Sequence, residues 1–338
     1  MATFKEIRGQ LIKKYTTNPT NPLEGQMWYN NTTGTLKVYR NLGAAWSSAT
    51  ALNTAVVASK GWGPQTAATV AGGNSPTYPP STGATQLYDG SAWTTSPASL
   101  SPGKSEGGTS QAGTQTAAWF SGGVSPGGRS NATEEFDGSA WTGGGTYPLS
   151  ISMGGAGTLT AGLGFGGYQP ATPEMFKPTT CEYDGTSWTA ANGLTTGRSD
   201  TQAGVGLQTA ALTAGGTSGP PAPLTNMVNS ESYDGTSWTA TNTLPVGRSS
   251  CSLFGTASIA KIFGGRTPPV PTISDTTSDW DGTSWAASPV TLATARTNMS
   301  GAGITGTAGL CAGGNPGTLD VVEEYNDPTI SIQTVTTS

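Results

Sequence analysis

A six-fold repeat with a period near 48 residues constrains this chain more than any other feature. Gly-Gly pairs recur with spacings of 50, 44, 49, 49 and 49 residues, at Gly72-Gly73, Gly122-Gly123, Gly166-Gly167, Gly215-Gly216, Gly264-Gly265 and Gly313-Gly314. An aromatic-Asp-Gly-x-x-Trp unit follows each of the first five pairs, and the sixth copy is reduced to EEYNDP at Glu323–Pro328. Repeats of this length are structural units that bury their apolar faces against neighbouring copies. The chain is therefore expected to be an array of similar units.

Each repeat predicts four short strands. Small residues, as in Gln208–Gly216, suit a crowded inner strand, and the two glycines that follow suit a close approach of two backbones. A longer loop leads to a strand that ends in Tyr-Asp, and Asp-Gly then favours a tight hairpin turn before the strand that carries the Trp. A basic residue precedes the first strand of four repeats, at Lys104, Arg198, Arg248 and Arg296. The pattern predicts an all-β fold.

The spaced Gly-Gly, Tyr-Asp and Trp landmarks resemble the kelch motif over roughly Asn53 to Tyr325. This resemblance implies a six-bladed kelch-like β-propeller. The first repeat departs from the motif because it lacks the basic residue, and the third has Ser150-Ile151-Ser152 where Arg would stand. We expect the basic residues to hydrogen-bond to the backbone of neighbouring blades rather than to a ligand. The repeated tryptophans are expected to pack between blades; they are Trp46, Trp93, Trp141, Trp188, Trp238 and Trp285.

Two segments could complete the last blade, whose sixth repeat has no Trp. Leu36–Trp46 resembles a degenerate Tyr…Trp unit, and we expect it to supply the outer strand and leave no open edge. The alternating tail, Thr329–Ser338, could fill the same place. The predicted domains are an arm and hairpin at 1–35 and the propeller at 36–338, with 36–50 closing the last blade.

The first 30 residues lie outside the repeat. Phe4, Ile7 and Leu11 are spaced as on a short helix, although an extended arm is equally compatible with Gly9. Glu24–Tyr39 predicts a hairpin with Asn30–Gly34 at its tip. Its NPLEGQMWYNNTTGTLKVY string resembles a hairpin module of phage structural proteins, especially tail fibres and other virion appendages. That resemblance implies an arm that docks on other virion proteins, with Phe4, Ile7, Leu11, Trp28 and Tyr29 as candidate contacts.

Composition excludes several classes of protein. Charged residues make up 10% of the chain, the formal net charge is -5, and no basic stripe indicates nucleic-acid binding. No apolar run is long enough to cross a bilayer, and no secretory signal is visible at the N-terminus. Histidine, the commonest metal ligand and general base, is absent. Cys181, Cys251 and Cys311 have no paired spacing and are expected to be small buried residues.

Catalysis is not expected, and neither is a cofactor. The adjacent acid pairs Glu134-Glu135 and Glu323-Glu324 would point to opposite faces of a strand, which makes them poor catalytic partners. Binding is expected instead on the Pro-rich loops between the Gly-Gly and Tyr-Asp landmarks, although these could equally be plain surface or subunit-packing loops. The candidate residues on these loops are Tyr78, Pro79, Tyr168, Phe176, Pro220, Met227, Arg266 and Pro268.

The function expected from these features is that of a non-enzymatic virion structural protein of a bacteriophage, as a fibre, a tail appendage or a capsid-attached subunit. Its arm would dock on the particle and its propeller would face outward, where it could contact a host-surface glycan or protein. Neither nucleic-acid binding nor membrane insertion is expected, whereas a homo-oligomer is. The alternative is a stand-alone carbohydrate- or protein-binding kelch module, and an enzyme ranks third.

Overall fold

The computed structural model describes residues 12–19, 26–40, 43–76, 81–170, 172, 174–199, 204–219, 225–268, 272–327 and 331–334. These residues are all-β apart from one short 3-10 turn, η1 (Gln65–Ala67). None of the described segments is a helix long and apolar enough to cross a membrane. The chain divides into two compact units. Unit 1 is Met1–Ala44 with Asp327–Ser338, and unit 2 is Ala45–Asn326.

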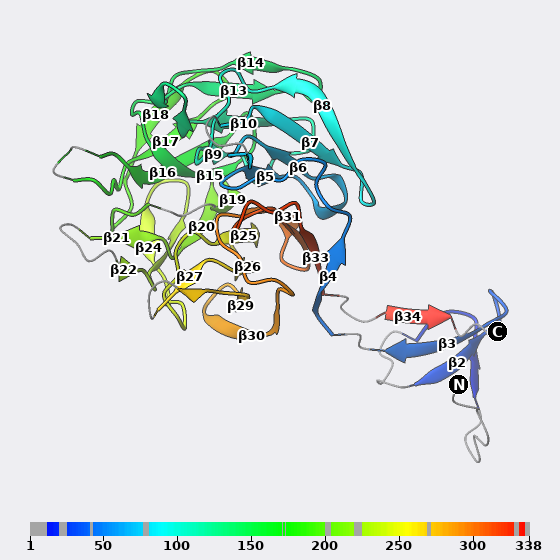
Figure 1. The fold of residues 1–338 in the computed structure, drawn as a ribbon. Coiled ribbons are helices and arrows are strands. Elements are labelled where there is room, and N and C mark those ends of the chain that lie inside the picture. Colours follow the sequence, from blue (N-terminus) through cyan, green and yellow to red (C-terminus); the bar gives the residue numbers. More distant parts are fainter. Residues whose placement is uncertain are drawn as a thin grey trace. The chain divides into compact units, whose positions relative to one another are not determined.

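Unit 2 contains six four-stranded antiparallel sheets in its described part (Figure 1). Sheet 1 is β5 (Lys60–Trp62), β6 (Thr69–Ala71), β7 (Ala84–Tyr88) and β8 (Trp93–Ser99). Sheet 2 is β9 (Gly108–Thr109), β10 (Ala118–Ser121), β13 (Thr133–Phe136) and β14 (Trp141–Gly143), and sheet 3 is β15 (Ser152–Gly157), β16 (Gly162–Tyr168), β17 (Thr180–Tyr183) and β18 (Trp188–Ala191). Each of these three sheets holds one sequence repeat.

The remaining sheets follow the same order. Sheet 4 is β19 (Val205–Leu207), β20 (Ala210–Ala214), β23 (Ser230–Tyr233) and β24 (Trp238–Ala240), and sheet 5 is β25 (Ser252–Gly255), β26 (Ala260–Phe263), β29 (Thr276–Trp280) and β30 (Trp285–Thr291). Sheet 6 is β31 (Ser300–Thr305), β32 (Ala308–Ala312), β33 (Val322–Asn326) and β4 (Ala45–Ala49). Two-stranded ribbons extend three of the loops between second and third strands: β11 (Val124–Ser125) with β12 (Gly128–Arg129), β21 (Thr217–Ser218) with β22 (Thr225–Asn226), and β27 (Arg266–Thr267) with β28 (Thr272–Ile273).

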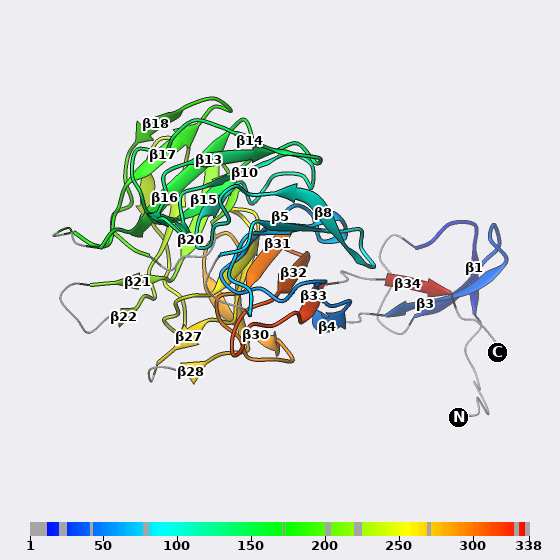
Figure 2. The same ribbon diagram turned by 45° about the horizontal axis from the view of Figure 1, so that its top comes forward.

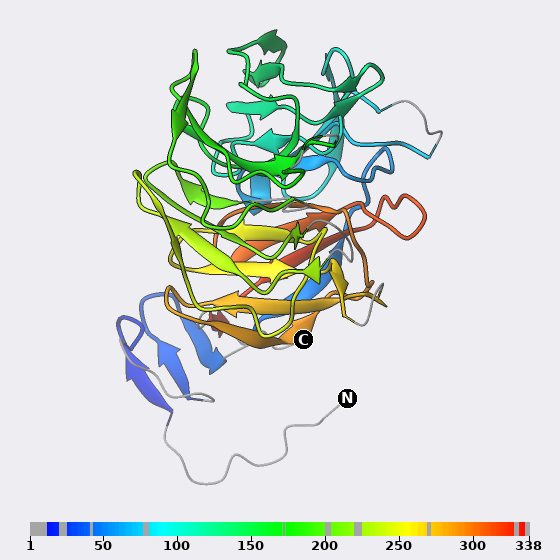
Figure 3. The same cartoon turned by 90° about the vertical axis from the view of Figure 1, so that its left-hand side faces the viewer.

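The sheets pack side by side through their first strands. β5 lies against β9, β9 against β15, β15 against β19, β19 against β25, β25 against β31, and β31 against β5. Figure 1 shows these first strands toward the middle of unit 2 and the fourth strands toward its outside, and Figure 3 shows neighbouring sheets as successive layers. The fold of this unit is therefore all-β and propeller-like.

The last sheet takes its outer strand from the segment around Trp46. β4 pairs with β33, and Trp46 lies opposite Tyr325. The C-terminal strand β34 (Ser331–Thr334) pairs instead with β3 (Thr35–Arg40) in unit 1. The predicted domain boundary after residue 35 is wrong, because β3 is the partner of both β2 (Met27–Asn30) and β34, and the chain divides after Ala44.

Unit 1 is a small sheet in the order β1-β2-β3-β34, shown in Figure 2. β1 (Lys13–Tyr15) runs parallel to β2, and β2 and β3 form an antiparallel hairpin. The tip is the turn at 31–34, where Gly34 has a φ of 65°. Asn30 Oδ1 accepts the N–H groups of Thr32 and Thr33 at 3.0 Å each, which explains why Asn ends the Trp-Tyr-Asn string.

The tryptophan of each sheet joins it to the preceding sheet. The indole N–H of Trp141 donates to Thr85 Oγ1 at 2.9 Å, and that of Trp188 donates to Thr133 Oγ1 at the same distance. Trp238, Trp285 and Trp46 repeat the bond to Thr180, Ser230 and Thr277. The equivalent position in sheet 6 is Val322, which has no hydroxyl, so Trp93 donates to the Thr50 carbonyl at 3.1 Å instead.

Tyrosine and glutamine side chains also cross between sheets. Tyr88, Tyr183 and Tyr233 each donate a phenol hydrogen bond to a glutamate of the preceding sheet, namely Glu324, Glu135 and Glu182. Burial and the bond to Glu135 raise the pKa of Tyr183 to about 12. Gln65 Nε2 donates to the carbonyls of Gly309 at 3.0 Å and Tyr325 at 2.8 Å, and so ties sheet 1 to sheet 6.

The Asp-Gly turns are held by their own carboxylates. Asp89 Oδ1 accepts the backbone N–H groups of Ser91 and Ala92, each at 2.8 Å. The same arrangement recurs at Asp137, Asp184, Asp234 and Asp281. Hydrogen bonds from the backbone lower the pKa of each of these carboxyls.

Replacing Trp46 tests the contribution of β4 to sheet 6. Trp46→Ala removes the bond to Thr277 and the ring contacts with Phe263 at 5.0 Å and Tyr325 at 5.4 Å. We expect a loss of about 3 kcal/mol in the free energy of unfolding, the lower end for a Trp-to-Ala change because Trp46 is half-buried. Trp46→Phe, which loses mainly the N–H bond, should cost about 1 kcal/mol. Equal urea midpoints for the two variants would contradict this role.

Acid titration tests the turn carboxylates. Since their folded-state pKa lies below that of an unfolded Asp, about 3.9, their stabilisation is present above that pH and is lost as pH falls through the folded pKa. The urea midpoint should therefore fall below about pH 4. Asp184→Asn and Asp234→Asn together should flatten this dependence relative to the unsubstituted chain. An unchanged acid profile in the double variant would refute the assignment.

Candidate functional site

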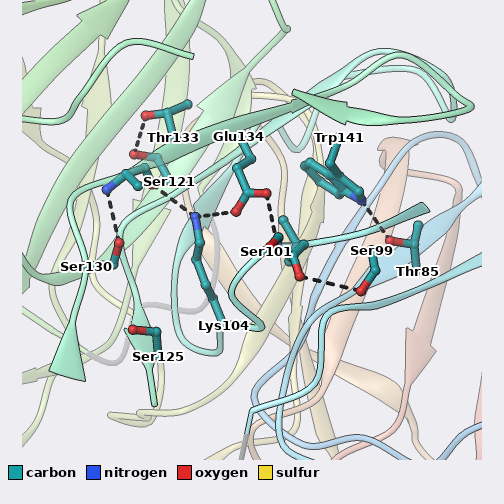
Figure 4. A network of polar contacts seen from close by, with 12 residues as sticks. Thr85, Ser99, Ser101, Lys104, Ser121, Ser125, Ser130, Thr133, Glu134 and Trp141 are labelled. Atoms are coloured by element: carbon teal, nitrogen blue, oxygen red, sulfur yellow. Dashed lines mark hydrogen bonds and ion pairs between the residues drawn. The ribbon is translucent and has the colours of Figure 1, made fainter. Parts of the chain in front are cut away.

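The basic residues that precede the first strands are buried in ion pairs. Lys104 Nζ lies 2.7 Å from Glu134 Oε1, as Figure 4 shows, and its side chain is fully buried. Arg198 pairs with Glu231, and Arg296 pairs with Glu323. In each pair the glutamate lies on the third strand of the sheet that the basic residue precedes.

Several other polar atoms of these pairs are bonded to the backbone. Arg198 Nη1 donates to the carbonyls of Gly215 at 3.1 Å and Asn229 at 3.0 Å, and Glu231 Oε2 accepts the N–H of Thr195 at 2.7 Å. Arg296 and Glu323 repeat this arrangement. Because breaking such a pair leaves a buried charge, these residues hold each sheet to the segment before it. Their charges are therefore not available to a ligand.

Sheets 1, 3 and 5 lack the ion pair, each in its own way. Val56 and Gln86 take the two places in sheet 1, and Ile151 and Cys181 take them in sheet 3. Arg248, before sheet 5, faces Ser278 and Thr276. Their hydroxyl oxygens accept hydrogen bonds from its Nη2 at 3.4 and 3.2 Å. Burial away from any carboxylate lowers the pKa of Arg248.

First strands of neighbouring sheets approach each other closely through their backbones. A Cβ on Gly61 would lie 2.6 Å from the Gly301 carbonyl oxygen, and one on Gly108 would lie 2.8 Å from that of Gly154. Gln111, itself buried, donates from Nε2 to the Leu253 carbonyl of sheet 5 at 3.2 Å. This close approach explains the small residues of the inner strands.

The Pro-rich loops emerge on what we call the loop face, the end of unit 2 formed by the connections between second and third strands. Tyr168 is half-buried, with its ring 5.6 Å from Phe176 and 4.9 Å from the Arg129 guanidinium. Ser152 Oγ accepts from Arg129 and donates to Glu106 Oε2 at 2.9 Å. The structure thus gathers Tyr168 and Phe176 into one aromatic and cationic cluster.

Other predicted loop residues are scattered. Arg266 and Pro268 are exposed, but Phe176 and Met227 are buried, at 8% and 4% exposure. The expectation that Phe176 and Met227 are exposed was wrong, because both are packed beneath the loop backbone that they anchor: Met227 N–H donates to Gly216 O, and Lys177 N–H, next to Phe176, donates to Gly167 O. Tyr78, Pro79 and Pro220 lie outside the described residues.

The candidate docking residues of unit 1 also differ in how exposed they are. Trp28 is fully buried and Tyr29 is 36% exposed, since neighbours on a strand point to opposite sides. Trp28 Nε1 and Asn30 Nδ2 both donate to Asn18 Oδ1, at 3.4 and 3.3 Å. Trp28 therefore packs inside unit 1, and the docking roles of Trp28 and Tyr29 stay predictions. Phe4, Ile7 and Leu11 lie outside the described residues.

Cys181, Cys251 and Cys311 are buried thiols. Burial raises the pKa of Cys181, and it raises that of Cys311 to about 12. A thiol in such surroundings stays protonated near neutral pH and is a poor nucleophile. Within the described residues, no three His, Cys, Asp or Glu side chains are placed to hold a metal ion.

Sequence reasoning missed a cavity on the opposite end of unit 2, which we call the turn face. This face is formed by the turns between first and second strands and by the Asp-Gly turns. A cavity of about 530 Å³ opens here, and Leu207 and Ile304 are among its lining residues, at 51% and 37% exposure. The sequence did carry a signal for this cavity. The fourth, fifth and sixth repeats have an aliphatic residue in or beside the turn between their first and second strands, namely Leu207, Ile259 and Ile304, where the first two repeats have Gln, Thr or Ala.

No family model matches this chain, and no curated protein matches its sequence.

Substitutions at Glu231 test the buried pair. Glu231→Leu leaves Arg198 without its carboxylate and should lower the free energy of unfolding by about 3–5 kcal/mol. Glu231→Ser copies the natural arrangement of Arg248 and Ser278 and should cost clearly less. The measurement is urea unfolding of the full chain, with Glu174→Ser in a loop as the control. Similar losses for the Leu and Ser variants would contradict the account of Arg248.

Proposed function

We propose that unit 2 is a closed, six-bladed, kelch-like β-propeller. The six four-stranded sheets are its blades, and support for closure comes from the contact of β31 with β5 and from the bonds of Gln65 to sheet 6. β4 then acts as the clasp, because it places a strand from before the first repeat on the outer edge of the last blade. A closed ring of this kind has no exposed edge between its first and last blades.

We propose further that the protein is a non-enzymatic structural component of a phage virion, as a fibre, a tail appendage or a capsid-attached subunit. The observation that carries this proposal is the Trp-Tyr-Asn hairpin of unit 1, which resembles the module of phage structural proteins and is held by Asn18 through Trp28 and Asn30. β34 completes the same sheet, so both end regions of the chain take part in one unit. In this proposal unit 1 attaches to the particle and the propeller faces outward.

A non-enzymatic role fits the way the chain uses its reactive groups. Four of the basic residues that recur in the repeats are buried against glutamates, hydroxyls or carbonyls, and the three thiols are buried. The groups left exposed on unit 2 are mainly turn carboxylates already bonded to backbone N–H groups. Residues that stabilise the fold are poorly placed for acid–base or nucleophilic chemistry.

A stand-alone binding module is the second candidate. The observation that favours it is the rigid ring with ligand-sized concavities on its turn face, since binding sites are concave and mostly preformed. In that case the loop-face cluster around Tyr168 or the turn face would bind a glycan or a protein without any particle.

Particle composition separates the two candidates. Virions purified by density gradient from the phage whose genome carries this chain should contain it in a fixed ratio to the major capsid protein, measured by quantitative mass spectrometry. Antibodies against exposed residues of unit 2 outside the turn face, such as Val246 and Arg266, should label intact particles in electron microscopy. Absence from the particles would refute the virion role, and strong glycan-array binding by the free protein would then favour the binding module.

A further inference from the structure

The turn-face cavity is apolar at its centre. Its lining comes from four sheets and includes Leu207, Ala210, Ala257 and Ile304, with the hydroxyls of Thr256 and Ser258 as side-chain polar groups. A third aliphatic side chain, Ile259, lies in the same turn as Ala257 and is 47% exposed. Since exposed aliphatic residues gathered at one concavity often mark an interaction site, this region is a candidate for binding an apolar side chain.

A second cavity adjoins the first. It measures about 570 Å³ and shares Ala257 and Gly282 with the apolar cavity. Thr241, Asn242 and Thr283 are among its lining residues, so hydroxyl and amide groups continue from the apolar floor toward the outside of sheets 4 and 5. A bound peptide could therefore place an apolar side chain in the first cavity and polar groups along the second.

The surroundings of these cavities are anionic. The turn face carries the five aspartates of the Asp-Gly turns, all of them exposed: Asp89, Asp137, Asp184, Asp234 and Asp281. Its turns, at 63–68, 110–117, 158–161, 208–209, 256–259 and 306–307 and at the five Asp-Gly units, contain no Lys or Arg. The Asp281 turn borders both cavities through Gly282. The charge favours a cationic partner and disfavours an acidic one.

One segment of the chain has the complementary character. Residues 1–14, MATFKEIRGQLIKK, carry four basic residues and one acidic residue, a net charge of +3, while the whole chain has a net charge of -5. Phe4, Ile7 and Leu11 supply three large apolar side chains between those charges. Lys13 and Lys14 are exposed at the start of unit 1.

We propose that the turn face of one copy binds the N-terminal segment, residues 1–14, of a second copy. An apolar side chain of the segment fills the cavity beside Leu207 and Ile304, and its basic residues lie toward the turn aspartates. Since donor and acceptor surfaces differ, the contact is head-to-tail and gives rings or filaments of copies rather than a two-fold dimer. The inference does not depend on the virion role and stands or falls separately from it.

Peptide binding tests the interface directly. A fluorescent peptide of residues 1–14 is titrated with full-length protein and followed by anisotropy, beside a scrambled peptide of the same composition. Leu207→Ser and Ile304→Ser should each weaken binding at least tenfold. Val246→Ser, of similar exposure at 46% but outside the turn face, should leave it unchanged. Circular dichroism of the three variants shows whether they remain folded.

Self-association provides the second readout. Sedimentation velocity of the full chain should show concentration-dependent species larger than a monomer, which salt reduces because the exposed charges are screened. Deleting residues 1–11 or introducing Leu207→Ser should restore the monomer. The proposal is overturned if the full chain stays monomeric while the deleted chain binds the peptide, if the scrambled peptide binds as well, or if Val246→Ser weakens binding as much as Leu207→Ser.

Discussion

The indole N–H of one tryptophan per repeat ties each sheet of unit 2 to the sheet before it. A four-stranded sheet with strands this short cannot bury an apolar face by itself and must share its core with its neighbours. A tryptophan supplies the large apolar surface for that purpose, but its N–H needs an acceptor once it is buried. A Thr or Ser at one place on the third strand meets this need in five sheets, and the Thr50 carbonyl meets it in the sixth. The repeat therefore encodes the bond between units as well as each unit.

The buried ion pairs show how the same scaffold accepts substitutions. The basic residue and its glutamate occur together in sheets 2, 4 and 6, and both are replaced by uncharged side chains in sheets 1 and 3. Leaving one partner alone would bury an unpaired charge, so the two positions are physically coupled. Arg248 is the exception, and it is accommodated because two hydroxyls and two carbonyls surround its guanidinium.

The repeated basic residues are buried inside unit 2, so its exposed groups of interest lie on its two faces. The loop face presents an aromatic and cationic cluster around Tyr168 and Arg129. The turn face presents an apolar cavity surrounded by aspartates. Between the two faces, first strands of neighbouring sheets approach closely and Gln111 bonds to the Leu253 carbonyl. The two faces therefore present different sets of exposed side chains.

The sequence by itself determined the number of repeats, the strand that carries each Trp and the Asp-Gly turns, because these depend on residues close together along the chain. The small residues and glycines of the inner strands also indicated that these strands are crowded. Tertiary structure decided which side chains are exposed: Trp28, Phe176 and Met227 are apolar residues in predicted contact regions, and all three are buried. It also decided that β3 and β34 belong together and that Leu207 and Ile304 share one cavity. Those relations join residues nearly 100 to 300 positions apart, and no local pattern of sequence specifies which distant turns meet.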